Sequence, residues 1–505
     1  MATITHRQLV ITFALIMGLF LAALEGTVIS TAMPTIIAQL GGLEVYSWAF
    51  SSYMLASTTT IPIFGRLSDL YGRKPIYISS ILLFLLGSAL CGQSQNMTEL
   101  IAFRAIQGLG AGGLLPVTFT IIGDLFTFEQ RARMQGLFSS VWGVSSVIGP
   151  LIGGFLVDNV SWRWVFYLNI PFGLLAATII LLRFHEAVED RAGGQVDYRG
   201  ALLLAVSVLS LLFALLEGGR QYAWADPRIV GLLITSVLGL AAFIRLEQRI
   251  DEPLMPLSLF KDRLYLVASG YNFLAGFALM GIVSYIPLFV QGVLETSATR
   301  AGATLTPLSL AWVSGSIISG QLLLRVGPRQ IVFAGAASLL TGTFVVTRLG
   351  IASTQLLAVI GMMFMGMGMG LTLTSFLVSV QNRNRRAQLG VATSGLQFIN
   401  NIGSTIGVSV LGTVMASRLS DGLATLPGGK SVNPVSLLDS NNQTKLPPAV
   451  DEAFQELLAS ALHPAFVIAF GVALAALIVV LFTPRGSSRA LVEETKSPLE
   501  SVTGR

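Results

Sequence analysis

A single carboxylate, Glu25, lies in the middle of an apolar stretch, FLAALEGTVISTAMP (residues 20–34). Apart from Thr12, residues 10–24 are all apolar or glycine. A carboxyl group in such surroundings can hold a proton, and when ionised it attracts a cation. Competition between a proton and a cationic molecule for this group would couple the movement of one to that of the other. The alternative is a structural glutamic acid that stays neutral and hydrogen-bonded.

Arg104 is the one basic residue that falls within an apolar segment of the sequence at more than two residues from the segment's ends. A charge at the centre of a membrane helix costs about 3 kcal/mol on insertion scales. We therefore expect Arg104 to face a central cavity and to alter the proton affinity of a carboxylate there, with Glu25 as its electrostatic counterpart. The alternative is a side chain that extends to the nearby outer membrane surface.

The composition predicts that helices in a lipid bilayer position these residues. The 505 residues are 53% hydrophobic and 11% charged, and the mean hydropathy is +0.74, whereas soluble domains carry about 25% charge. Only helices or closed barrels satisfy every backbone group in lipid, and the long continuous runs exclude a barrel. The sequence predicts an all-α integral membrane protein with fourteen spans: 9–38, 45–65, 76–95, 99–124, 135–157, 163–184, 199–217, 228–247, 264–291, 299–324, 330–349, 354–380, 388–416 and 463–483.

Basic residues indicate the orientation of these spans. Most of the 31 Lys and Arg residues fall in the segments that share a side with both termini, which predicts cytoplasmic termini. This topology accounts for the net charge of +5, so we expect no nucleic-acid partner. The first apolar segment is too long for a cleaved signal peptide. The long outer segment 417–462 is predicted to be a flexible excursion that ends in a short amphipathic helix.

An internal repeat divides the chain. RARMQGLFSSVWGVSSVIGPLIGG (131–154) aligns without gaps to RRAQLGVATSGLQFINNIGSTIGV (385–408), and GRLSDLYGRK (65–74) aligns to GQLLLRVGPR (320–329). Two six-helix halves in parallel topology are typical of transporters that bind substrate at the midplane between halves. We predict a first half (1–184), a linker with two inserted helices (185–262), a second half (263–483, including the outer loop 417–462) and a cytoplasmic tail (484–505).

The segment GRLSDLYGRKP (65–75) predicts a latch at the cytoplasmic membrane edge. Its glycines, Gly65 and Gly72, allow a close helix approach and a tight turn. Asp69 can pair with a basic residue or cap the positive end of a neighbouring helix, which would hold the inward side shut. Further members are Arg73, Lys74 and Asp124. The alternative is that the basic residues serve only the positive-inside rule, which would not explain Asp69; the repeat has Leu324 at that position.

The segment GVSSVIGPLIGG (143–154) predicts a packing motif. Pro150 removes a helix hydrogen bond and favours a kink. Gly149, Gly153 and Gly154 leave a smooth face for another helix.

Several segments resemble motifs of one family. GRLSDLYGRKP resembles the signature loop of the major facilitator superfamily, and RAIQGLGAGGLLP (104–116) resembles the span-4 motif of its proton-coupled members. GVSSVIGPLIGG is similar to a motif of its drug antiporters. LEGTVISTAMP (24–34) and WRWVFYLNIPFG (162–173) resemble signatures of the fourteen-span drug:proton antiporter branch. The resemblance covers residues 9–483.

The resemblance implies the superfamily's fold, with two extra helices, and roles for individual residues. It implies a latch role for Asp69, a role in proton coupling for Arg104, and packing of the fifth span against the other half. The branch more often has Asp at the position of Glu25, so cargo cannot be transferred from Asp-containing relatives.

These expectations define a proton-coupled antiporter that exports hydrophobic, cationic drugs by alternating access. The alternative is the same fold exporting a lipid, a siderophore or another metabolite. An enzyme or an ATP-driven pump is not expected, since no reactive constellation or phosphate-binding loop is present. We expect no metal and no cofactor, the proton gradient as energy source, a monomer, and the bacterial cytoplasmic membrane as location. Candidate cavity side chains, for each of which ordinary helix packing is the favoured alternative, are Tyr53, Trp142, Tyr271, Asn272, Trp312, Gln397, Asn400 and Asn401.

Overall fold

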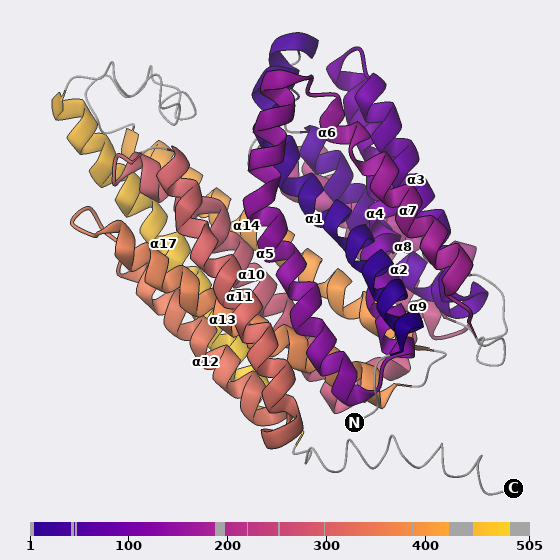
Figure 1. Cartoon of the computed structure of the whole chain (residues 1–505). Helices are drawn as coiled ribbons and strands as arrows, with labels where there is room; N and C mark the ends of the chain where they lie inside the picture. The colour runs from indigo at the N-terminus through magenta and orange to yellow at the C-terminus, as the bar shows by residue number, and fades with distance from the viewer. Residues whose placement is uncertain are drawn as a thin grey trace, which may run out of the picture. The chain divides into compact units, whose positions relative to one another are not determined.

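A computed structural model describes most of the chain as long helices (Figure 1). The described residues are 5–41, 45, 48–186, 197–219, 221–250, 253–296, 298–384, 388–423 and 448–484. Parts of the predicted linker (187–196), of the outer loop (424–447) and of the tail (485–505) lie outside this set.

Within the described residues, the first predicted half forms seven helices, and side chains at the N-cap position cap the starts of three of them. Its helices are α1 (His6–Leu40), α2 (Trp48–Tyr71), α3 (Arg73–Gln93), α4 (Met97–Leu125), α5 (Phe128–Asn159), α6 (Trp164–Tyr167) and α7 (Asn169–Arg183). Thr5 and Thr127 each form a capping box before α1 and α5, and Asn96 accepts a hydrogen bond from the backbone at the start of α4. The sixth predicted span is divided at Leu168 into α6 and α7, a break that hydropathy alone did not indicate.

The remaining helices follow the predicted order. They are α8 (Tyr198–Glu217), α9 (Pro227–Glu247), the short 3₁₀ helix η2 (Leu257–Lys261), α10 (Arg263–Gly292), α11 (Ala298–Val326), α12 (Pro328–Thr347), α13 (Gln355–Arg383), α14 (Leu389–Leu423) and α17 (Pro448–Leu481). The helix predicted in the outer segment and the last span form one continuous helix, α17. The separate surface helix was therefore a wrong prediction: Leu458, Ala461 and Leu462 are buried.

Twelve helices of the described residues are long and apolar enough to cross a membrane, so the chain is a multi-pass membrane protein but the predicted number of fourteen is not confirmed. The two predicted spans that are absent from the twelve are 45–65 and 135–157. They correspond to α2 and α5, which have 24 and 32 residues. Serine and threonine are frequent in α2 and lower its hydropathy, whereas the side chains of several residues within α5 lie outside the described set.

The described helices fall into two compact units. One contains Met1–Leu266 with Leu377–Phe398, and the other contains Val267–Phe376 with Ile399–Ser488. The end of α13 and the start of α14 therefore belong to the first unit although the repeat assigns them to the second half.

Glycines hold α4 between two neighbours in the first unit. A Cβ on Gly108 or Gly112 would overlap α2, at Tyr53 and Thr60, whereas a Cβ on Gly110 would overlap the backbone of α3 at Phe84. The GLGAGG segment thus presents two glycine faces on opposite sides of one helix. This close approach allows many van der Waals contacts without any side chain between the backbones.

The second unit repeats this packing with α13. Gly366 and Gly370 lie against α11, at Leu308 and Trp312, whereas Gly368 lies against α12 at Gly335. The glycines that alternate with methionine in this stretch therefore serve helix packing.

Two glycines at equivalent places in the repeat share an unusual backbone conformation. Gly72 precedes α3 with φ +98°, and Gly327 precedes α12 with φ +83°. Residues with a side chain rarely adopt this region, so both turns require glycine. The predicted alignment of 65–74 with 320–329 thus has a structural counterpart.

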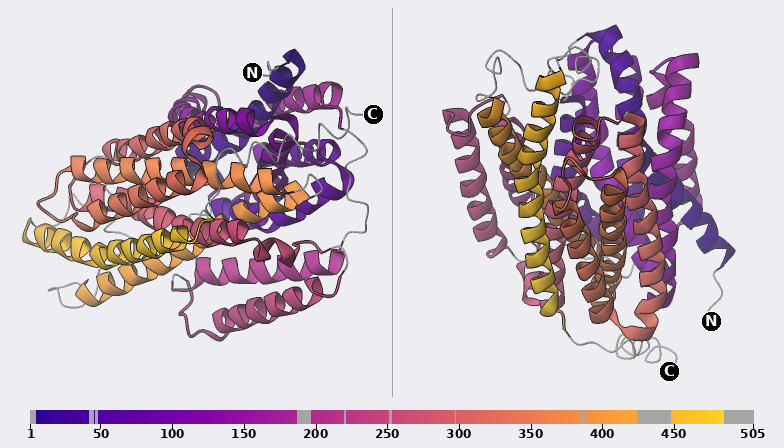
Figure 2. Two further views of the ribbon diagram at one scale, coloured as in Figure 1. Left: turned by 90° about the horizontal axis from the view of Figure 1, so that it is seen from below. Right: turned by 90° about the vertical axis from the view of Figure 1, so that its left-hand side faces the viewer.

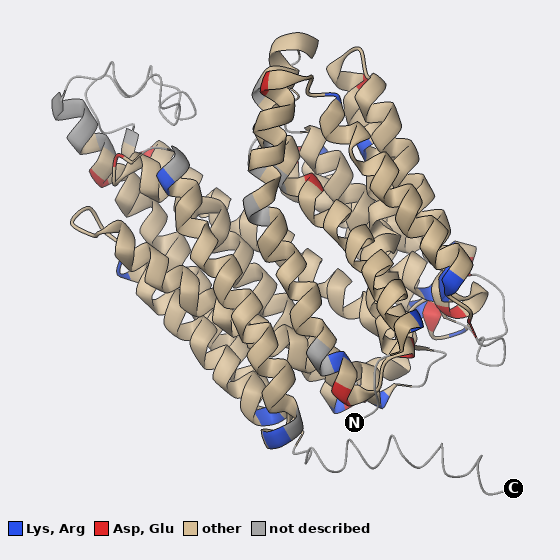
Figure 3. Cartoon of the chain, viewed as in Figure 1, with Lys and Arg blue, Asp and Glu red and all other residues tan. Residues whose placement is uncertain are grey.

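The two inserted helices form a hairpin on the first unit. Helices α8 and α9 lie side by side (Figure 2, left view), and α8 packs against α2. The rings of Trp48 and Phe213 contribute to that contact, with centroids 5.1 Å apart. Charged side chains are concentrated toward the helix ends (Figure 3), as expected for helices whose middle parts face lipid.

Candidate functional site: two buried polar networks

Glu25 and Arg104 form an ion pair inside the first unit. Glu25 lies on α1 and Arg104 on α4, and Arg104 Nη1 contacts Glu25 Oε1. Each residue exposes only 1% of its surface. The pair is thus removed from solvent, where an ion pair is stable only if hydrogen bonds satisfy its remaining polar atoms.

Additional partners hold the guanidinium of Arg104. Its Nε donates to the backbone oxygen of Ala49 at 2.9 Å, and Nη1 donates to Gln107 Oε1 at 2.8 Å. The ring of Tyr53 lies 4.3 Å from the guanidinium carbon, in cation–π geometry. These contacts to α2 and α4 fix Arg104 independently of Glu25.

An amide from α7 binds the other oxygen of Glu25. Asn169 Nδ2 donates to Glu25 Oε2 at 3.0 Å and to Ser88 Oγ on α3 at 2.9 Å. Asn169 is the first residue of α7, at the break after α6, and Pro171 in the same turn needs no helical hydrogen bond. We refer to Glu25, Arg104, Gln107, Ser88 and Asn169 as the Glu25 network.

Sequence reasoning named two members of this network and missed the other three. A polar residue within an apolar span was the available signal for Gln107 and Asn169, and both are fully buried. The expected position of Arg104, facing a central cavity, differs from what the structure shows. The side chain is enclosed by α1, α2 and α4 in the described conformation, so cargo could touch the pair only after these helices rearrange.

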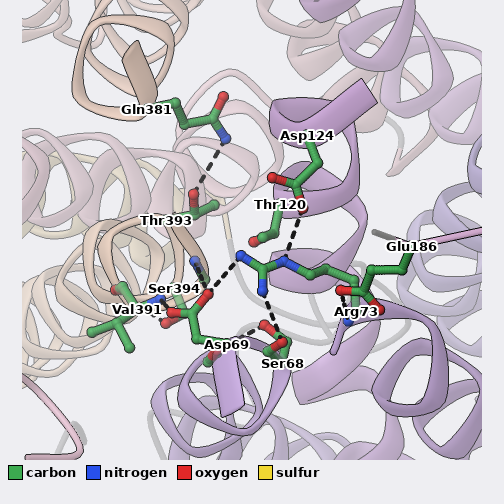
Figure 4. A network of polar contacts seen from close by, with 12 residues as sticks. Ser68, Asp69, Arg73, Thr120, Asp124, Glu186, Gln381, Val391, Thr393 and Ser394 are labelled. Carbon is green, nitrogen blue, oxygen red and sulfur yellow. Dashed lines mark hydrogen bonds and ion pairs between the residues drawn. The ribbon is translucent and has the colours of Figure 1, made fainter. Parts of the chain in front are cut away.

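The second network surrounds Asp69, near the end of α2 (Figure 4). Asp69 Oδ1 accepts a hydrogen bond from the backbone of Gly390, and Oδ2 accepts one from Val391, both at 2.9 Å. These are the free N–H groups at the start of α14, where the helix dipole is positive. Asp69 is fully buried and caps α14 across more than 300 residues of sequence.

Arg73 joins the carboxylate of Asp69 to the carboxylate of Asp124. Its Nη2 lies 2.9 Å from Asp69 Oδ1, its Nε lies 2.9 Å from Asp124 Oδ2, and Nη1 donates to the backbone oxygen of Ser68 at 3.1 Å. Arg73 is 3% exposed, whereas Asp124 at the end of α4 is 18% exposed. We refer to Asp69, Arg73, Asp124, Gly390 and Val391 as the Asp69 network.

Two residues that the sequence did not indicate extend this network (Figure 4). Glu186 accepts a hydrogen bond from the backbone of Arg73 at 2.8 Å, which caps the start of α3 where Gly72 has no side chain. Gln381 on α13 donates to the backbone oxygen of Phe119 at 3.1 Å and to Thr393 Oγ1 at 3.2 Å. The contacts of Glu186 with Arg73 and of Gln381 with Phe119 join residues that are distant in sequence, which no local pattern reveals.

Gly65 permits the contact between α2 and α14. A Cβ on Gly65 would overlap Ser394 and approach the backbone oxygen of Gly390, and a Cβ on Gly390 would overlap the backbone oxygen of Gly65. The two helices therefore touch through their backbones. Lys74, in contrast, is only partly buried, and its predicted latch role stays a prediction.

The predicted packing motif of α5 contacts α1 through one glycine. A Cβ on Gly153 would overlap Thr31 and approach Val28, whereas a Cβ on Gly154 would meet open space. Gly149 is buried, and the side chain of Pro150 lies outside the described set. The expected packing of this motif against the other half stays a prediction.

The predicted cavity residues differ in their surroundings. Trp142 on α5 is 47% exposed, and Gln397 is half-buried. In the second unit, Asn400 donates to the backbone oxygen of Asn272 at 2.9 Å, and Asn272 donates to that of Ala268. The Asn400 amide thus joins α14 to α10, whereas the Asn272 amide bonds within α10, so part of their hydrogen-bonding capacity serves the helices themselves. Asn401 is half-buried.

The fold and these networks define a two-part helical membrane transporter, and sequence comparison identifies its family. Residues 15–408 match the Major Facilitator Superfamily. The chain belongs to this family, which confirms the family and the fold expected from its motifs. Because the family consists of membrane transporters, the chain is not an enzyme.

Two bacterial proteins illustrate the relationship. The chain is 39% identical to the multidrug transporter protein MdtP of Bacillus subtilis over 82% of its own length and 76% of that protein. It is 34% identical to multidrug resistance protein 3 of the same organism, over 98% and 99% of the two chains. The human organic anion transporter MFSD10 (TETRAN) shares the fold, with a TM-score of 0.63, 14% identity, and 94% and 100% of the two chains covered.

Proposed function

We propose that the protein is a proton-coupled antiporter that exports hydrophobic drugs, cationic ones among them, by alternating access. The names of the bacterial relatives support drug efflux. The buried ion pair between Glu25 and Arg104 carries the proposal of proton coupling. Burial of such a pair has a desolvation cost, and ionisable residues that membrane segments retain despite this cost usually belong to transport pathways.

Protonation of Glu25 removes one charge of the pair. Arg104 then keeps its bonds to Ala49 and Gln107, while α1 loses its electrostatic attachment to α4. Binding and release of a proton thereby alter the preference of α1 between two positions. With both termini in the cytoplasm, the Asp69 network closes the inward side, and release of α14 from Asp69 opens it.

The test is dye accumulation in an efflux-deficient bacterial host. Cells that express the wild-type protein should accumulate less ethidium than empty-vector cells, and an uncoupler of the proton gradient should abolish the difference. Glu25→Gln should abolish extrusion because it cannot lose a proton. Glu129→Gln, at an exposed position at the start of α5, is the matched control and should extrude ethidium like wild type.

Two outcomes contradict the proposal. Extrusion by Glu25→Gln at the wild-type rate would show that this carboxylate does not couple transport. Absence of any drug or dye phenotype, together with an altered content of a host lipid or metabolite, would assign a different cargo to the same fold.

A further inference from the structure

Asn169 has an orientation that the surrounding hydrogen bonds determine. Ser88 Oγ donates its hydrogen to the backbone oxygen of Phe166 at 2.9 Å, so the same oxygen can only accept from its other neighbours. It accepts from Asn169 Nδ2 at 2.9 Å and from Gln107 Nε2 at 3.3 Å. Ser88 therefore keeps the NH₂ group of Asn169, rather than its oxygen, turned toward Glu25.

This orientation leaves a polar atom without a partner. Asn169 Oδ1 is buried and accepts no hydrogen bond within the described structure. A buried unsatisfied oxygen is costly, and a reversed amide would offer that oxygen to a protonated Glu25. The network thus tolerates an unsatisfied oxygen in order to direct two N–H donors at Ser88 and at the carboxylate.

From this geometry we infer that Asn169 is a positioning residue of the proton site, which favours ionised Glu25 and so promotes proton release. An ionised carboxylate only accepts hydrogen bonds, whereas a protonated one also needs an acceptor for its hydrogen. Asn169 presents a donor to Glu25 Oε2, which suits the ionised state. Protonation makes Glu25 a weaker acceptor and adds an O–H group that finds no acceptor on the Asn169 NH₂, so it loosens the contact between the start of α7 and α1.

Other titratable or charged groups also face Glu25 in the described structure. They are Arg104 on α4, Tyr53 on α2 and Cys91 on α3. Arg104 supplies the opposite charge on Oε1, and the two remaining groups are neutral in their ordinary state. From α7, Asn169 donates a hydrogen bond to the second carboxylate oxygen of Glu25. The inference rests on the proposed function, since it assigns a second determinant to the same proton site.

The test is the pH dependence of ethidium transport in proteoliposomes that contain the full chain. Asn169→Leu keeps a similar volume without a donor and should move the midpoint of the profile about 1 pH unit toward higher pH, because a hydrogen bond to a charged group is lost. Ser88→Ala should move it in the same direction by less. Asn169→Ser, which restores a short donor, should return it part of the way.

Controls separate this inference from the proposed function. Asn159→Leu removes an exposed amide that donates to Phe155 at the end of α5 and should leave the midpoint in place. Wild-type transport that ignores the proton gradient would refute the proposed function itself. If wild-type transport depends on the proton gradient but the pH midpoint of Asn169→Leu equals that of wild type, only the role of Asn169 is refuted. If Asn169→Leu folds but does not transport ethidium, the pH midpoint of ethidium binding is measured instead. A binding midpoint equal to that of wild type would likewise refute the role of Asn169.

Discussion

The ion pair between Glu25 and Arg104 makes each partner dependent on the other. A buried charge whose partner is removed costs about 3 to 5 kcal/mol, whereas removal of both partners is often nearly neutral. Arg104→Met should therefore lower the free energy of unfolding by about 3 kcal/mol, while the double variant Glu25→Gln/Arg104→Met should recover part of the loss. Thermal unfolding of the detergent-purified protein measures both. A double variant less stable than Arg104→Met would contradict the pairing.

The cap that Asp69 places on α14 depends on charge as well as on shape. Asp69→Asn would present an NH₂ group to Gly390 or Val391, each of which also offers only an N–H donor. We expect at least a tenfold loss of ethidium extrusion with normal membrane expression. Glu129→Gln, at an exposed position at the start of α5, is the control and should retain most activity. Wild-type extrusion by Asp69→Asn would exclude a role of this cap in transport.

At the scale of residues, the sequence reveals charges that are out of place but not the neutral groups that hold them. Glu25, Arg104 and Asp69 stand out because ionised side chains are rare in apolar segments. Asn169, Gln381 and Glu186 do not stand out, since an isolated amide or a helix-end carboxylate is common in membrane proteins. Their partners lie more than a hundred residues away, and only the tertiary structure brings them together.

Among the elements, α4 depends most on its glycines. Gly110→Ala would place a methyl group against the backbone of Phe84 and Ser80 on α3, which must move apart. The variant should lower the thermal unfolding temperature by several degrees, because overpacking costs about 1 to 3 kcal/mol. On α9, a Cβ at Gly231 would meet no atom within 4 Å. Gly231→Ala should therefore leave the thermal unfolding temperature unchanged or raise it, since alanine favours a helix. Equal effects of the two substitutions would argue against close packing.

Helix ends were the least predictable part of the elements. The sixth span breaks at Leu168 because a short turn and the segment NIP start a new helix there, and hydropathy averages over such a break. Conversely, α17 continues through Pro464, where the sequence predicted a separate outer helix. A proline inside a helix is tolerated when neighbouring helices support the freed backbone groups, and that support cannot be read from the local sequence.

For the whole molecule, the repeat was readable from sequence but its asymmetry was not fully so. Helices α4 and α13 each present glycines to two neighbouring helices, and the glycine turns before α3 and α12 follow the alignment. The Asp69 network does not, because Leu324 replaces the acid in the second copy. Two similar halves therefore differ at the position where the first half caps α14.

Orientation in the membrane can be tested with cysteine labelling. Cys91 is the one cysteine of the sequence and is buried, so the wild-type protein should not react with an impermeant maleimide. With cytoplasmic termini, Gln95→Cys should react in intact cells, whereas Lys261→Cys should react only after permeabilisation. Both positions are exposed. The reverse pattern would invert the predicted topology.

Helix α4 carries a member of each network. Arg104 and Asp124 are twenty residues apart on it, which corresponds to about 30 Å along the axis. Pro116 lies between them and removes one hydrogen bond from the rod. Under the proposed function, protonation near Arg104 would be transmitted along α4, with Pro116 as its weakest point, to the closure near Asp124. Cargo that contacts neither residue would then still be coupled to the proton, so the cargo-binding surface would be under no constraint from the proton site and could accept molecules of unlike shape.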